Sequence, residues 1–340
     1  MRELVAPALA IAVCVLVGNL LILAVGQQPL EVWSVLAAGT WGNGYGIGQV
    51  LFKATPLALA GLSVAIALNA GLFNIGAEGQ LSLGALATAV VGLALPRSTP
   101  WPLALFAAIG AGVIAGAVVG AIPGVLKARF GAHEVIGTIM LNFIVLALIN
   151  WLVAPGRLAQ PESQSTAPVI AAATIPRLSS FVPALGGSAA SLAALLAVAV
   201  AWLTHFGFRR TTLGYELVAF GLRPAAAEAG GIRAGRVIVV AMALSGGVAG
   251  LVGANNVLGY KHYFEAGFSG GIGFMGLAVA LLGRNHPLGI LLAALLFGTL
   301  SQGALAINGV VPKELIDVLQ AIVILAVVAA SSDVLRRGTR

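Results

Sequence analysis

Polar side chains interrupt one stretch of an otherwise apolar chain. The run NAGLFNIGAEGQLSLGAL at residues 69–86 carries two asparagines, a glutamate and a glutamine. Amides and carboxylates are costly in hydrocarbon and normally face a cavity, a partner helix or one another. Two interpretations follow. Asn69, Phe73 and Asn74 are candidate contacts for a polar solute that crosses the bilayer, or the stretch builds a turn in which Glu78 caps the helix that follows.

Two further segments carry candidate contacts. Asn142 lies in the middle of the apolar run HEVIGTIMLNFIVLALIN, where an asparagine usually joins helices, with a contribution of about 1 kcal/mol, and where it is also suited to a polar path. The glycine-rich run GFSGGIGFMGLAVALLG at 267–283 favours a half-helix or close helix packing. Its Phe274 and Met275 would contact an aromatic solute by stacking or through sulfur.

Residue types for catalysis or metal binding are sparse. The four histidines have no metal-ligand spacing, and the single cysteine, Cys14, lies in an apolar run. No serine or cysteine nucleophile can be grouped with a histidine and an acid. We therefore expect no metal site, no cofactor bound by this chain and no enzymatic activity. Most acidic residues lie near the ends of apolar segments, which disfavours an ion-coupled carrier, with Glu78 as the exception.

The composition determines the class of protein. Hydrophobic residues make up 59% of the 340 residues and charged residues 9%, and the mean hydropathy is +1.03. A soluble domain carries about 25% charged residues. We predict an all-α, polytopic membrane protein that forms one transmembrane domain over residues 1–340. The net charge of +7 reflects topology rather than a nucleic-acid partner.

Ten apolar segments are long enough to be candidate spans. They are residues 4–25, 55–73, 78–95, 102–125, 134–153, 188–206, 236–258, 266–283, 287–307 and 314–331. The eighth segment is either a span or a re-entrant segment. The expected number of transmembrane helices is about ten, within a range of eight to ten. With both termini in the cytoplasm, the inside segments hold about twice as many Lys and Arg residues as the outside segments. External loops are then expected at 26–54, where the glycines of 39–49 disfavour a helix, and at 154–187.

The predicted cytoplasmic loop at 207–235 is the one sizeable polar stretch on the inside. It reads GFRRTTLGYELVAFGLRPAAAEAGGIRAG, and Pro224 is suited to the first position of a second short helix. One interpretation is a basic loop that contacts anionic lipid. The other is a docking element, because apolar side chains rimmed by charge usually mark a partner site.

Three motifs resemble a known family. NAGLFNIGAEGQL at 69–81, GYELVAFGLRPAAAEAGGI at 214–232 and SGGVAGLVGANNVLG at 245–259 are similar to the membrane subunits of bacterial ABC importers for simple sugars, branched-chain amino acids and nucleosides. NIGAEGQ at 74–80, the segment 267–289 and QGA at 302–304 look most like the nucleoside permeases. The resemblance covers roughly residues 50–335.

The resemblance implies a type II importer fold with about ten spans, arranged as two inverted five-helix halves. It also implies partners: ABC ATPase subunits that use ATP and Mg²⁺, a second and related permease subunit, a lipoprotein or periplasmic substrate-binding protein, and the lipid of the bacterial inner membrane. The motif at 214–232 matches the family's coupling helix. Its candidate ATPase contacts are Gly214, Tyr215, Glu216, Leu217, Phe220, Gly221, Arg223, Pro224, Ala226, Ala227, Gly230 and Gly231.

The implied function is import of purine or pyrimidine nucleosides across the membrane. The sequence has no P-loop pattern G-x-x-x-x-G-K-[ST], so an ATP-driven permease of this kind needs a separate ATPase. A simple-sugar permease of the ribose type is the alternative within the family. An ion-coupled secondary carrier, with Glu78 as the coupling acid, is the alternative from another class.

Overall fold

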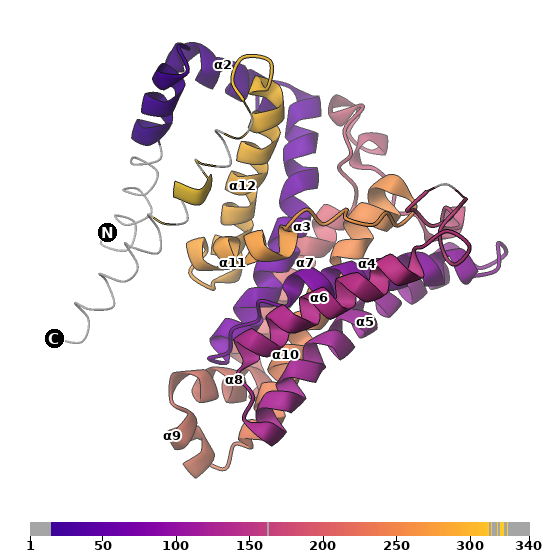
Figure 1. Cartoon of the computed structure of the whole chain (residues 1–340), viewed down its shortest axis with the longest axis vertical. Coiled ribbons are helices and arrows are strands. Elements are labelled where there is room, and N and C mark those ends of the chain that lie inside the picture. The colour runs from indigo at the N-terminus through magenta and orange to yellow at the C-terminus, as the bar shows by residue number, and fades with distance from the viewer. Residues whose placement is uncertain are drawn as a thin grey trace.

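The computed structural model describes residues 15–312 except residue 162, together with residues 314, 318, 320–322 and 325. Within them the chain is helical, with no named strand. Figure 1 shows long helices that cross one another and an end formed by two short helices, α8 and α9. The main helices are α2 (Pro29–Thr40), α3 (Gly44–Asn69), α4 (Ala77–Ala94), α5 (Trp101–Phe130), α6 (Glu134–Leu152), α7 (Ala193–Arg210), α8 (Thr212–Leu222), α9 (Pro224–Ala229), α10 (Ala234–Gly250), α11 (Ile272–Leu282) and α12 (Pro287–Ile307).

Helix α3 is the central element of the fold. Its residues from Ala54 to Ala67 are all buried, as expected for a helix that is apolar on every side. α10, α11 and α12 all pack against it. By contrast, α5 and α6 expose large apolar side chains on their outer faces, which suits contact with lipid. These side chains include Phe106, Ile114, Val118, Ile136, Phe143 and Ile144.

Six helical segments of the described part of the chain are long and apolar enough to cross a membrane. A seventh arises if the helix Val15–Ala24 and α2, which are bent by 114° at Gly26, are one broken span. The prediction of a polytopic helical membrane protein is confirmed. Most of the predicted tenth span at 314–331 and the start of the first lie outside the described residues.

One sequence prediction about local structure is wrong, and for residues 266–283 the structure agrees with the re-entrant, half-helix alternative. Residues 26–54 are largely helical rather than an external loop, because α2 occupies 29–40 and α3 begins at Gly44. The Asn43 side chain accepts a hydrogen bond from the Gly46 amide and so caps α3 in spite of its glycines. The predicted span 266–283 is reduced to α11, whose 11 residues extend about 16 Å and cannot cross a bilayer alone.

Glycines allow α5 and α10 to pack closely. Gly112, Gly116 and Gly120 follow one another at four-residue spacing along α5 and face the backbone of α10 around Gly246 and Gly250. A Cβ atom at Gly116 would collide with the Gly246 carbonyl group. In lipid, no hydrophobic driving force brings helices together. Small residues at such spacing let two helices approach closely and associate through van der Waals packing. This contact fixes the position of α10 relative to α5.

The long connection between α6 and α7 is irregular, as predicted for 154–187. It contains three short 3₁₀ turns, at Ala171–Ala173, Leu178–Ser180 and Pro183–Leu185. Backbone hydrogen bonds join part of it to the segment after α10. The connection therefore covers the end of the helices that lies away from α8 and α9.

Candidate functional site: a polar network, an aromatic cavity and an arginine-rich end

Asn74 is the centre of a buried polar network. Its Nδ2 donates to Gln80 Oε1 at 2.7 Å and to Ser245 Oγ at 2.7 Å, while its Oδ1 accepts from the Gly76 amide at 2.9 Å. The Ser245 hydroxyl donates in turn to the Ser63 carbonyl at 2.7 Å. Asn74 is 1% exposed. The network therefore connects the turn before α4 to α3 and α10, and its polar groups satisfy one another inside the protein.

Asn142 joins α6 to the same turn. Its Oδ1 accepts from the Gly79 amide at 2.9 Å and its Nδ2 donates to the Ile75 carbonyl at 2.9 Å. Gly79 lies in the first turn of α4, where amide groups have no partner within their own helix. Asn142 supplies that partner from α6.

The Glu78 carboxylate caps α11 rather than its own helix, α4, so the capping prediction named the wrong helix. Oε2 accepts from the Gly273 amide at 2.7 Å and Oε1 from the Gly271 amide at 3.2 Å. Gly271 adopts a φ of +87°, which a residue with a Cβ rarely adopts. Gly273 in the first turn of α11 is buried and Gly271 is half-buried, and a carboxylate is the favoured group at a helix N-terminus with free amides.

A cavity of about 670 Å³ lies between α3, α12 and the segment that follows α10. Its aromatic lining consists of Phe52, Tyr260, Tyr263 and Phe268. Its polar lining consists of Lys53, Asn256, Lys261, Glu265, Ser301 and Gln320. Volume and lining match the usual ligand pocket, which is mostly apolar with a few converging polar groups. Of the residues predicted from sequence to contact a solute, Met275 lines this cavity.

Two irregular helical segments build the cavity wall. Pro56 has no amide hydrogen, so the carbonyl of Phe52 loses its partner within α3, and the Asn255 Nδ2 donates to that carbonyl at 3.3 Å. Asn255 belongs to a π-helix, η4 (Ala254–Lys261), which continues α10. π-Helical turns are rare and often occur at functional sites. The ring centroids of Phe52 and Tyr260 consequently lie 4.7 Å apart, with an interplanar angle of 55°.

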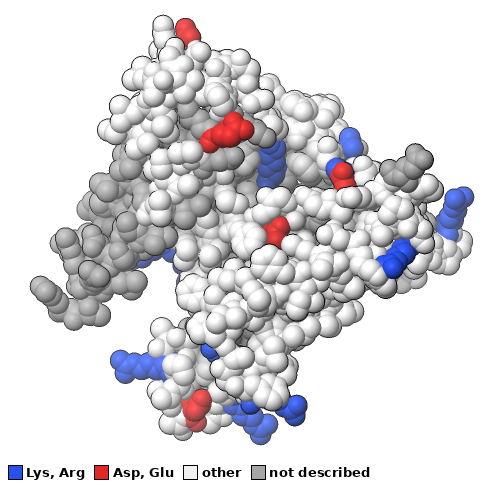
Figure 2. All heavy atoms as spheres, in the orientation of Figure 1, with Lys and Arg blue, Asp and Glu red and all other residues white. Residues whose placement is uncertain are grey.

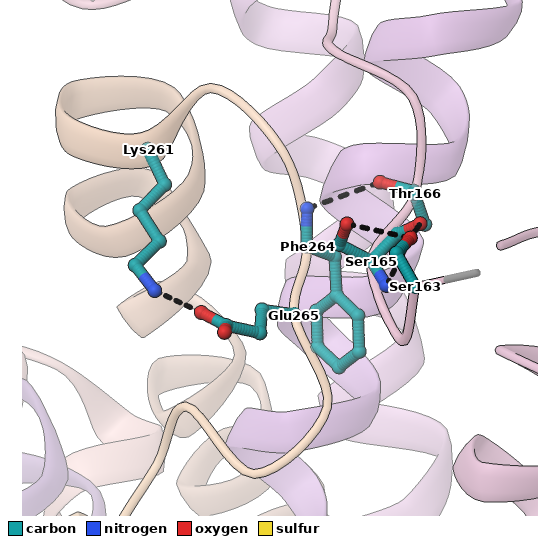
Figure 3. Close-up of polar contacts among 6 residues, drawn as sticks. All are labelled: Ser163, Ser165, Thr166, Lys261, Phe264 and Glu265. Carbon is teal, nitrogen blue, oxygen red and sulfur yellow. Dashed lines mark hydrogen bonds and ion pairs between the residues drawn. The ribbon is translucent and has the colours of Figure 1, made fainter. Parts of the chain in front are cut away.

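The rim of the cavity is tied to the long α6–α7 connection (Figure 3). The Thr166 amide donates to the Phe264 carbonyl at 2.9 Å, and the Phe264 amide donates to Thr166 Oγ1 at 3.1 Å. Figure 3 shows Lys261 and Glu265 paired beside the same segment, and both residues line the cavity. Burial lowers the pKa of the neighbouring His262 and so favours its neutral imidazole. The connection thus fixes the segment that carries part of the lining.

The end of the fold formed by α8 and α9 carries a group of basic side chains. Figure 2 shows several blue groups and one red group at the end where Figure 1 places α8 and α9, and further charged side chains elsewhere on the surface. The arginines of this end are Arg209, Arg210, Arg223, Arg233 and Arg236. This distribution is typical of a membrane protein whose polar end faces the cytoplasm.

Helix α8 sits on the turn between α3 and α4. Leu217 and Phe220 are buried against the ends of α3 and α10, whereas Tyr215 is 69% exposed. Gly221 lies so close to Gly71 that a Cβ atom on Gly221 would be 2.8 Å from the Gly71 nitrogen. Thr211 caps α8, and Pro224 is the first residue of α9, as predicted.

The other predicted ATPase contacts divide between buried and exposed positions. Gly214 and Ala227 are buried, and Glu216 is half-buried. The exposed residues are Arg223, Pro224, Ala226, Gly230 and Gly231. α8 and α9 therefore present one face to the protein and leave the other open.

The remaining residues predicted to contact a solute lie away from the cavity. Asn69 Nδ2 donates to the Ala65 carbonyl within α3 at 2.8 Å. Phe73 is 46% exposed in the α3–α4 turn, and Phe274 is 52% exposed on α11. Sequence reasoning missed Phe52 and Lys53, which the predicted loop at 26–54 contained. A weak signal was present, because a lysine next to an aromatic residue just before an apolar run is unusual for a glycine-rich loop.

Metal binding has no support in the described residues, where no group of three or more His, Cys, Asp and Glu side chains could hold an ion. The sequence separates His205 from His286, but their rings lie 5.5 Å apart at an angle of 73°. Two histidines alone provide too few ligands for a structural metal site.

Comparison with known proteins identifies the family. The model of the permease component of the branched-chain amino acid transport system matches residues 46–328. A guanosine ABC transporter permease protein of Bacillus subtilis, NupP, is 38% identical over 99% of this chain and 95% of its own. A glucose ABC transporter permease protein of Haloferax volcanii, TsgB13, is 35% identical over 95% and 87%. A nucleoside ABC transporter permease protein of Lactococcus lactis, NupB, is 34% identical over 95% and 90%.

No solved structure matches the chain. The family match covers the cavity, the polar network and α8 together. Since the match extends over more than half of the chain, and the relatives align along nearly their whole length, this chain belongs to the permease family of ABC transporters.

Proposed function

We propose that this chain is the membrane-spanning subunit of an importer that carries nucleosides across the bacterial inner membrane, with both termini in the cytoplasm. The observation that carries the proposal is the cavity of about 670 Å³ with four aromatic side chains, in a chain 38% identical to a guanosine permease protein. A nucleobase is flat and aromatic. Every base has a π-face, so purines and pyrimidines alike stack on Phe, Tyr and Trp rings.

Energy for transport comes from separate ATPase subunits in this proposal. The chain has no P-loop, and it is proposed to bind no cofactor itself. The exposed face of α8 and α9 is the proposed ATPase contact, with Tyr215, Glu216, Arg223 and Pro224 among its residues. A second, related permease completes the path, and a lipoprotein or periplasmic protein delivers the substrate.

The packing of α8 supports this division of labour. α8 contacts the ends of α3 and α10 through Leu217 and Phe220, and both helices lead to the cavity. Lys53 lies about 25 Å along α3 from Asn69, by the rise of an α-helix. A displacement of α8 by the ATPase would therefore move two walls of the cavity as rigid elements.

The alternative substrate is a simple sugar, and one observation favours it. A glucose permease protein is 35% identical to this chain over 95% of its length. Sugars also lie against aromatic rings and bind paired charged groups such as Lys261 and Glu265. An ion-coupled carrier has weaker support, because both Glu78 oxygens already accept amide hydrogen bonds and the group is 5% exposed.

The test is uptake by the complete complex in proteoliposomes, with ATP inside and the cognate binding protein outside. We expect import of guanosine and uridine that needs ATP, and no import driven by a proton or sodium gradient alone. Ribose and glucose serve as competitors and as labelled substrates. Import of glucose without nucleoside would assign the sugar function, and gradient-driven uptake without ATP would contradict the ABC mechanism.

A further inference from the structure

Lys53 is a cationic side chain inside a candidate membrane span. It lies on α3 and lines the cavity, and its Nζ donates to the Ser301 carbonyl of α12 at 2.9 Å. Among the residues that the structure describes, the ion pairs are Lys127 and His133 with Glu134, and Lys261 with Glu265. Lys53 is in none of them. An ionisable side chain within a membrane span is energetically costly, and such a residue usually marks a substrate pathway.

Among the described residues, the Ser301 carbonyl is the acceptor recorded for the Lys53 ammonium group. An ammonium group has three N–H donors, and the Ser301 carbonyl uses one. The second lysine of the lining, Lys261, is already neutralised by Glu265. Within the described lining, Lys53 is thus the positive group without an acidic partner, and a neutral ligand with a strong acceptor would accept a hydrogen bond from it.

An aromatic surface lies beside this donor. Phe52 precedes Lys53 on α3, and its ring packs on the ring of Tyr260 at 4.7 Å between centroids. Both rings line the cavity. Because the two rings are tilted by 55°, a planar heterocycle would stack on one of them and lie against the other, with its edge within the reach of a lysine side chain from the adjacent residue. Carbonyl oxygens on that edge accept hydrogen bonds, whereas aromatic C–H groups do not.

We propose that Lys53 is a specificity-determining residue of the transport path, and that it donates to the carbonyl oxygen of an oxo-nucleobase stacked on Phe52 and Tyr260. This inference rests on the proposed nucleoside function and adds the chemical feature that Lys53 recognises, the ring carbonyl oxygen. The ligand class is neutral nucleosides with a ring carbonyl, such as inosine, guanosine and uridine. Nucleosides without one are accepted by stacking but gain nothing from the lysine.

The test compares inosine with purine riboside, which lacks the C6 carbonyl. The complete complex, with its binding protein and ATP, is reconstituted with wild-type permease, Lys53→Met or Lys261→Met. The mutant rate is divided by the wild-type rate for each nucleoside, so the preference of the binding protein cancels. We expect Lys53→Met to lower inosine uptake by about tenfold, the loss typical of one charge-assisted hydrogen bond, and to change purine riboside uptake by less than about twofold.

Controls separate recognition from folding. The Lys53→Met permease is expected to co-purify with its partner subunits in the same amount as the wild type, and Lys261→Met is expected to affect both nucleosides alike. If the Lys53→Met complex fails to assemble, Lys53→Gln, which keeps a neutral donor, is measured in the same way, and an equal loss for both nucleosides overturns the proposal.

The two levels of the argument fail differently. Equal mutant-to-wild-type ratios for inosine and purine riboside in the Lys53→Met complex, when the wild-type complex imports nucleosides, would overturn the role of Lys53 and leave the proposed function intact. A wild-type complex that imports glucose and no nucleoside would overturn both.

Discussion

At the scale of single residues, the polar groups of the 69–86 stretch satisfy one another or the free amides of helix ends. Asn74, Gln80 and Ser245 bond together, Asn142 caps the first turn of α4, and Glu78 caps α11. A buried amide without a partner costs about 1–3 kcal/mol. The polar stretch therefore stabilises the junction of five helices, and α11, which carries Met275 of the cavity lining, depends on it.

Glu78→Leu is expected to destabilise the protein strongly. The change leaves the Gly271 and Gly273 amides without acceptors, so we expect a loss of about 3 kcal/mol or more in the free energy of unfolding. Ser82→Ala on the same helix is the matched control. Its hydroxyl, also buried, bonds only to the Glu78 carbonyl within α4, and we expect a loss below about 1 kcal/mol.

The measurement is reversible unfolding of the purified permease in mixed detergent micelles, followed by circular dichroism. Similar unfolding midpoints for Glu78→Leu and Ser82→Ala would show that the carboxylate does not hold α11.

At the scale of elements, close packing between helices depends on glycines at a few positions and tolerates larger residues at others. α5 faces α10 through a row of glycines, and that contact sets the position of η4, which continues α10 and carries Asn256 and Tyr260 of the cavity. Gly110 lies on the same helix, α5, but a Cβ there would meet nothing within 4 Å. One helix thus contains glycines of both kinds.

Gly116→Ala and Gly110→Ala are expected to have effects of opposite sign. The new methyl group at position 116 collides with the backbone at Gly246, and overpacking of this kind costs about 1–3 kcal/mol. At position 110 the substitution raises helix propensity by up to about 1 kcal/mol without a contact. Thermal unfolding of the two variants in detergent provides the comparison, and a Gly116→Ala protein as stable as wild type would contradict the close approach.

At the scale of the whole molecule, the cavity and α8 lie at opposite ends of the same two helices. The turn at Gly71 presses against Gly221, and from this contact α3 leads to Phe52 and Lys53 while α10 leads into η4. Rigid helices transmit a displacement over such a distance when both arrangements are well packed. The contact between α8 and the α3–α4 turn is therefore where a motor subunit would act on the path.

Gly221→Ala is expected to uncouple ATP hydrolysis from transport. A Cβ at Gly221 would push α8 away from the turn, whereas Gly207→Ala, at the same end on α7, would meet nothing within 4 Å. In the reconstituted complex we expect uptake per ATP hydrolysed to fall by about tenfold for Gly221→Ala and to stay unchanged for Gly207→Ala. Equal coupling ratios in the two variants would contradict transmission through this contact.

The sequence by itself determined the class of protein and its local helical signals. A chain with 9% charged residues cannot cover its surface in water, so the membrane and the helices follow from composition. Pro224 at the start of α9 and the glycines before α11 act on their own backbone, and the structure agrees with both predictions. Motifs near residues 74, 214 and 245 sufficed to indicate the family.

Only the tertiary structure decided where the polar groups point and which residues form the cavity. Phe52, Tyr260 and Ser301 come from segments about 40 to 250 residues apart, and their meeting depends on how α3, η4 and α12 pack. By local sequence, Glu78 is placed to cap its own helix, α4. Packing brings the free amides of α11 near, and the carboxylate accepts hydrogen bonds from those amides instead. The glycines at 39–49 indicate a loop that includes Lys53, but the Asn43 cap starts α3 at Gly44 and outweighs their low helix propensity, so Lys53 lies in a helix.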